Sequence, residues 1–141
     1  MLKRIKTLLE DKALFIALFI TIFIAILSLA KIDSIVLEPS VPNIDKIYHS
    51  IAYFFLMLSW LYAFFKEETF LKKVKYIIFA CFVYGIVIEV LQAATTTYRT
   101  ASYLDIIANG SGVVLAALAF HFFEKKNSGY LMLNLVNHVI I

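Results

Sequence analysis

The chain has 141 residues, of which 62% are hydrophobic and 16% are charged, and its mean hydropathy is +0.88. Average soluble domains are about 45–50% apolar and about 25% charged, so this composition excludes an ordinary soluble enzyme. The single cysteine excludes a disulfide framework and a cysteine-based zinc site, and the net charge of +3 is too small to indicate nucleic-acid binding. The composition therefore predicts a membrane protein with one domain.

Four long, nearly uncharged segments follow one another along the chain. They cover about residues 13–30, 47–65, 76–94 and 106–123. As helices rising about 1.5 Å per residue they would be about 27–29 Å long, close to the thickness of a bilayer's hydrocarbon core. Backbone groups in lipid must be hydrogen-bonded within the segment, so we predict an all-α fold, a four-helix transmembrane bundle within residues 1–126. The basic start and the small residues at 28–30 also resemble a signal peptide, but the long apolar run favours a membrane span.

Lysine and arginine are unequally distributed between the segments that connect these spans. Ten of the 13 lie before the first span, between the second and third spans, or after the fourth, and the other three are Lys31, Lys46 and Arg99. Cytoplasmic segments carry the excess of positive residues, so we expect both termini in the cytoplasm and the loops at 31–46 and 95–104 outside. We expect residues 127–141 to form a cytoplasmic tail, with a polar break at 127–129 followed by a short helix in the membrane interface.

Polar residues within the spans gather near the predicted outer surface. They are Asp45, Lys46, His49 and Tyr53 at the start of the second span, Glu89 and Gln92 near the end of the third, and Asp105 and Asn109 at the start of the fourth. Most of them recur at three- or four-residue spacing and so share helix faces. At about 1.5 Å per residue, Tyr53 would lie about 9 Å below the surface, Glu89 about 8 Å and Asn109 about 5 Å. The sequence therefore predicts that three helices bring their polar faces to one outward-facing pocket.

Glu89 is the most informative of these residues, because a charged group in a span costs about 2.5–3.5 kcal/mol on insertion scales. We expect that cost to be offset by Arg99, Lys46, His49 or a proton. Intramembrane ionisable groups are functional candidates, but the same residues could also form a network that only locks the helices together.

Three blocks of these residues resemble the VanZ-like family of membrane proteins. The first is Asp45-Lys46-Ile47-Tyr48-His49 followed by Tyr53, the second is Glu89-Val90-Leu91-Gln92, and the third comprises Arg99, Ser102, Asp105, Asn109 and Gly112. The resemblance implies a small multi-pass protein of the bacterial cytoplasmic membrane with a role in the cell envelope. The family's namesake lowers susceptibility to the glycopeptide teicoplanin, so the resemblance also implies a link to antibiotic resistance.

We interpret the pocket as a site that binds or acts on an amphiphilic envelope component, such as a lipid headgroup or a lipid-linked precursor. The candidate acid and base residues are His49, Glu89 and Asp105. The candidate ligand-binding residues are Asp45, Lys46, Tyr53, Gln92, Arg99, Ser102 and Asn109, with Arg99 and Lys46 holding an anionic group. The pattern fits binding and catalysis equally.

Two other functions compete with this interpretation. One is a structural or assembly protein with a helix-locking polar network. The other is a metal-dependent membrane hydrolase, since the pocket holds ligand types for Zn²⁺ or Mn²⁺. No short spacing such as His-Glu-x-x-His supports the hydrolase, so we expect no metal and no cofactor. The expected partners are the lipid bilayer and the amphiphile, without nucleic acid, and the apolar first span is compatible with a homo-oligomer.

Overall fold

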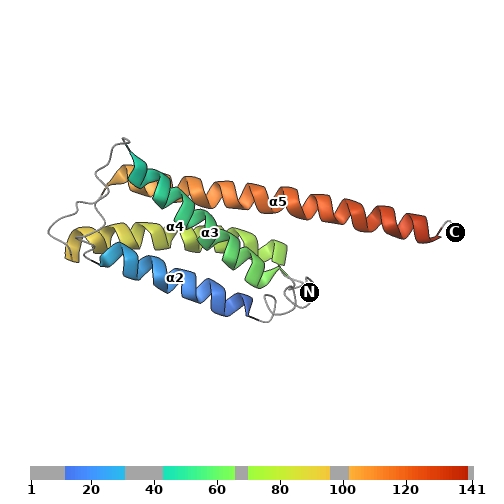
Figure 1. The fold of residues 1–141 in the computed structure, drawn as a ribbon, viewed down its shortest axis with the longest axis horizontal. Coiled ribbons are helices and arrows are strands. Elements are labelled where there is room, and N and C mark those ends of the chain that lie inside the picture. Colours follow the sequence, from blue (N-terminus) through green and yellow to red (C-terminus); the bar gives the residue numbers. More distant parts are fainter. Residues whose placement is uncertain (1–11, 31–42, 66–69, 96–101, 140–141) are drawn as a thin grey trace.

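A computed structural model describes residues 12–30, 43–65, 70–95 and 102–139, with side chains described up to residue 125. The described residues form four helices and no strand, which confirms the predicted all-α bundle (Figure 1). These helices are α2 (Ala13–Leu29), α3 (Ile44–Phe64), α4 (Phe70–Thr95) and α5 (Tyr103–Val139).

The helices have the length and the apolar outer surface of membrane spans. Three of them, namely α3, α4 and the Tyr103–Lys125 part of α5, are long and apolar enough to cross a membrane. α2 is a shorter apolar helix of 17 residues, which corresponds to about 26 Å. Large apolar side chains such as Phe15, Phe79 and Phe122 are exposed on the outside of the bundle. A soluble protein rarely shows such a surface, whereas contact with a bilayer requires it.

Three of the helices, α3, α4 and α5, begin before the uncharged segments from which they were predicted. α4 begins at Phe70 instead of residue 76, because the lysine-rich turn before the apolar run is also helical. The predicted polar break at 127–129 is wrong, since α5 continues without interruption to Val139 and projects far beyond the other helices (Figure 1). Asn, Ser and Gly each lower helix stability by about 1 kcal/mol or less, and the stretch contains no proline to end the helix.

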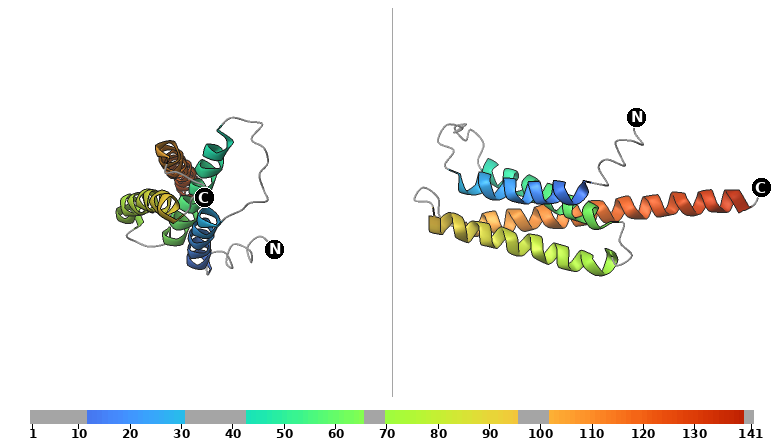
Figure 2. Two further views of the ribbon diagram at one scale, coloured as in Figure 1. Left: turned by 90° about the vertical axis from the view of Figure 1, so that its left-hand side faces the viewer. Right: turned by 90° about the horizontal axis from the view of Figure 1, so that it is seen from below.

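The chain crosses the bundle back and forth, so α3 and α5 run in the same direction and both begin where α4 ends (Figure 1). We call this end of the bundle the polar end. α3 and α5 form the most extensive helix pair, whereas α2 packs against α3 and α4 and lies away from α5 (Figures 1 and 2). The side of the membrane that each end faces is not defined by the helices themselves, and the cytoplasmic termini stay a prediction.

A glycine allows the close approach of α3 and α5. A Cβ atom added at Gly112 would lie 2.1 Å from the backbone oxygen of Ser50 and 2.9 Å from the backbone nitrogen of Phe54. Small residues let helix backbones approach closely in membranes, and here the approach joins the two helices that carry most of the polar residues. On the side of this contact away from the polar end, apolar side chains fill the bundle, among them Leu56, Met57 and Val113.

Candidate functional site

Polar side chains on the first turns of α3 extend from the surface into the bundle. Asp45 is exposed, His49 is half-buried, and Tyr53 is only 1% exposed. The three residues are four apart, so one face of α3 carries them all. Asp45 and Lys46 also form an ion pair at the start of the helix.

α4 contributes two buried polar residues near its end. Glu89 is 1% exposed and Gln92 is also buried. The Gln92 side-chain nitrogen donates a hydrogen bond of 2.7 Å to the backbone oxygen of Ser28 on α2. This contact gives Gln92, which we predicted as a ligand-binding residue, a role in joining α4 to α2.

α5 provides the partners for α3. The Lys46 ammonium lies 3.2 Å from a carboxylate oxygen of Asp105, whose side chain is 15% exposed. One turn further along α5, the Asn109 side-chain oxygen forms a hydrogen bond of 3.1 Å with Nδ1 of His49. The two polar contacts tie the beginnings of α3 and α5 together at the polar end.

The polar faces of three helices meet at one point. Nδ1 of His49 lies 3.8 Å from Oε1 of Glu89, as expected from their matching depths in the sequence. One potential metal-ligand atom from each of His49, Glu89 and Asp105 lies within 4.8 Å of the others. We refer to these three residues as the triad. The distances allow coordination of a cation, or proton exchange through a bridging water.

Two buried donors border the triad without a hydrogen-bond partner among the described residues. They are the Tyr53 hydroxyl and the side-chain nitrogen of Asn109, and both residues are at most 2% exposed. Gly85 of α4 leaves space for them, since a Cβ atom there would lie 3.0 Å from the Tyr53 ring and 3.3 Å from that Asn109 nitrogen. Buried polar groups are normally satisfied by protein, water or ligand, so these two donors are available to a bound molecule.

The predicted ligand-binding residues Arg99 and Ser102 remain to be placed. Arg99 lies outside the described residues. Ser102 precedes α5, and its backbone oxygen accepts hydrogen bonds from the backbone nitrogens of Asp105 at 3.1 Å and Ile106 at 3.3 Å. The described contacts of Ser102 are therefore those of a residue that begins a helix.

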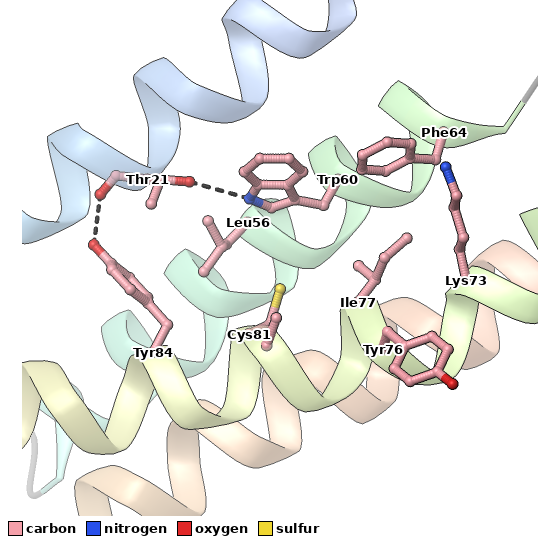
Figure 3. Close-up of a pocket in the computed structure, with 10 residues that line it drawn as sticks. Thr21, Leu56, Trp60, Phe64, Lys73, Tyr76, Ile77, Cys81 and Tyr84 are labelled. Carbon is pink, nitrogen blue, oxygen red and sulfur yellow. Dashed lines mark hydrogen bonds between the residues drawn. The ribbon is translucent and has the colours of Figure 1, made fainter.

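A separate apolar groove of about 410 Å³ lies between α2, α3 and α4 (Figure 3). Trp60 and Tyr84 close part of it, because the Trp60 ring nitrogen donates to the Thr21 hydroxyl at 3.1 Å and the Tyr84 hydroxyl donates to the Thr21 backbone oxygen at 2.6 Å. Lys73 lies at its other end, over the ring of Phe64. Sequence reasoning did not find this groove. The signal in the sequence was Thr21, which with Ser28 is one of two hydroxyl residues in an otherwise apolar helix.

Comparison with known protein families identifies a match for this chain. A family model described as VanZ/LLP1 matches residues 3–124, which include the polar end and all three triad residues. Neither the curated proteins nor the solved structures contain a match.

Proposed function

The chain belongs to the VanZ/LLP1 family, and from this premise we propose that its polar end is a pocket for an amphiphilic component of the bacterial cell envelope. The pocket binds or acts on the polar headgroup of a lipid or of a lipid-linked precursor at the outer face of the cytoplasmic membrane. An effect on susceptibility to the glycopeptide teicoplanin is part of this proposal, because it rests on the resemblance to the family's namesake.

The observation that carries the proposal is the meeting of the triad at one end of the bundle. Ionisable groups are expensive in a membrane, and they are concentrated where they serve a substrate or ion. Glu89 is 1% exposed and has His49 at 3.8 Å. A chain that used these residues for stability alone would gain as much from well-packed apolar side chains of similar size.

The pocket offers donors for an anionic headgroup. Lys46 is the cation at the entrance, beside Asp105. The Tyr53 hydroxyl and the Asn109 side-chain nitrogen lie deeper, have no hydrogen-bond partner within the described part of the chain, and could donate to a phosphate or carboxylate oxygen. Arg99 would add a planar guanidinium from the neighbouring loop, which forms paired hydrogen bonds with such groups. His49 and Glu89 would exchange a proton if the bound molecule reacts.

The site can be tested with phosphatidylglycerol as the probe, using the purified full chain in detergent and native mass spectrometry to count bound lipid. We expect Lys46→Gln to lower the affinity about 10- to 100-fold, because a hydrogen bond to a charged group contributes about 1.5–3 kcal/mol. Lys125→Gln is the matched control, since it removes one positive charge at an exposed position of α5 far along the helix from the polar end. Equal binding by wild type and Lys46→Gln, or an equal loss in the control, would contradict the proposal.

The helix-locking network is the second candidate, and the bond from Gln92 to Ser28 favours it. The two functions differ in what His49→Ala and Glu89→Gln should do. A binding pocket loses affinity for the probe while the yield of folded protein stays near that of wild type. A purely structural network loses binding and folded yield in parallel.

A further inference from the structure

We propose that the triad of His49, Glu89 and Asp105 binds a divalent transition-metal cation such as Mn²⁺ or Zn²⁺. This inference deepens the proposed function, on which it rests, by assigning an ion to the same pocket. It also departs from the sequence-based expectation of a metal-free site.

The spacing of the donor atoms fits a single ion after a small adjustment. Nitrogen and carboxylate oxygen ligands lie about 2.0–2.2 Å from such ions, so two ligand atoms on one ion are at most about 4.4 Å apart. The pair of His49 and Glu89, at 3.8 Å, already meets this limit. The widest separation within the triad is no more than 4.8 Å, which a change in side-chain torsion can close.

The donor set also fits the ion in kind. One imidazole and two carboxylates are typical ligands for Zn²⁺ and Mn²⁺, whereas a calcium or magnesium site is usually all oxygen. Each ligand comes from a different helix, α3, α4 or α5. The cation would therefore join three elements of the bundle at the level where their polar faces meet.

Asn109 holds the His49 ring beside the carboxylates. Its side-chain oxygen lies 3.1 Å from Nδ1, the same nitrogen that lies 3.8 Å from Oε1 of Glu89. Coordination through Nδ1 would replace this hydrogen bond, so the ion would compete with Asn109 for the imidazole.

Two buried donors without a described partner are a second observation in favour of a bound ion. The Tyr53 hydroxyl and the Asn109 side-chain nitrogen are buried beside the triad and have no hydrogen-bond partner among the described residues. Neither group would coordinate the cation. They would instead donate hydrogen bonds to a water or a phosphate oxygen bound to it, which explains why polar groups without partners border this point.

The two carboxylates of the triad favour a divalent over a monovalent cation. Glu89 and Asp105 place two carboxylates in the triad, and the nearby Lys46 is shared between Asp105 and Asp45. A divalent ion would neutralise the two carboxylates and would also attract an anionic headgroup. Lys46 attracts such a headgroup less strongly, because it is already paired with Asp45 and Asp105.

The test uses the full chain purified in detergent, stripped with EDTA and titrated with MnCl₂. We expect one Mn²⁺ per chain, with binding weakened at least about 100-fold in Glu89→Gln and Asp105→Asn, since loss of a ligand costs more than the about 10- to 100-fold lost with an outer-shell partner. Glu124→Gln removes a carboxylate outside the polar end and should bind as wild type does. Wild type that binds no Mn²⁺, or triad variants that bind it equally well, would overturn the inference.

A measurement on the wild type alone covers the case in which the triad variants do not fold. Pulsed electron paramagnetic resonance of the Mn²⁺ complex should show coupling to an imidazole nitrogen, because the triad contains one histidine. A complex without nitrogen coupling would place the ion elsewhere and refute the site.

The outcome is separable from that of the proposed function. If phosphatidylglycerol binding is unchanged by EDTA and no Mn²⁺ binds, the metal inference fails and the headgroup pocket stands. If Mn²⁺ binds to the triad and no headgroup binds, the metal inference stands and the proposed amphiphile is wrong.

Discussion

Replacing Gly112 with alanine should separate α3 from α5 and open the polar end. The added Cβ atom would lie 2.1 Å from the Ser50 backbone oxygen, whereas Cβ atoms in real structures essentially never lie within 3.0 Å of such a neighbour. The backbones must therefore move apart by about 1 Å, and neither side can yield by rotating a side chain. Overpacking of this kind costs about 1–3 kcal/mol and occasionally more.

The displacement reaches the triad because Ser50 directly follows His49. The hydrogen bond between His49 and Asn109 is 3.1 Å long, and an extension of about 1 Å would break it. We therefore expect Gly112→Ala to lose about 3 kcal/mol of stability and also to weaken probe binding at the polar end. Thermal unfolding in detergent and native mass spectrometry would measure the two effects separately.

Gly110→Ala is a matched control for this variant. It lies two residues away on α5, and its added Cβ atom would meet only the edge of the Phe82 ring, at 3.1 Å, which can rotate away. Any gain in helix propensity applies to both variants, so their difference isolates the contact with α3. If Gly112→Ala unfolds at the same temperature as Gly110→Ala, the reasoning from backbone contact is wrong.

Three further results can be expected. A cysteine introduced at Thr96 should react with a membrane-impermeant thiol reagent in intact cells and one at Glu68 should not, because the positive residues favour cytoplasmic termini; the reverse pattern would invert the topology. Arg99→Lys should weaken phosphatidylglycerol binding with normal folded yield, since lysine keeps the charge but loses the paired hydrogen bonds; unchanged binding in that assay would remove Arg99 from the pocket. Tyr84→Phe removes the 2.6 Å hydrogen bond to the Thr21 backbone oxygen, so thermal unfolding should show a loss of about 1 kcal/mol of stability. Probe binding should stay intact, and a loss of binding would link the groove to the polar end.

Much of the polar end was predictable from the sequence. Helical spacing placed His49 and Tyr53 on one face, and the common length of the spans put Glu89 at the same depth. In a membrane these two regularities are strong, because the bilayer sets the length of each helix and excludes polar groups from the lipid-facing side.

The contacts themselves required the structure. Residues 49, 89 and 105 are spread over three helices, so no short motif indicates that their ligand atoms meet within 4.8 Å. Gln92 looked like a member of the pocket, but its hydrogen bond to Ser28 depends on where α2 packs. The almost entirely apolar sequence of α2 does not specify that position. The apolar groove was missed for the same reason.

The parallel course of α3 and α5 has an electrostatic consequence for the polar end. The aligned peptide groups of a helix give its N-terminus about half a positive charge and its C-terminus about half a negative charge. The N-termini of α3 and α5 lie at the polar end, where α2 and α4 finish (Figure 1). The effect falls off within one turn, so each N-terminus acts on the side chains of its own first turn. Asp45 and Asp105 occupy the first turns of α3 and α5, where negative charge is favoured. The backbone thus stabilises negative charge at a depth where lipid would oppose it, and reversing the direction of either helix would remove that support even if every side chain kept its place.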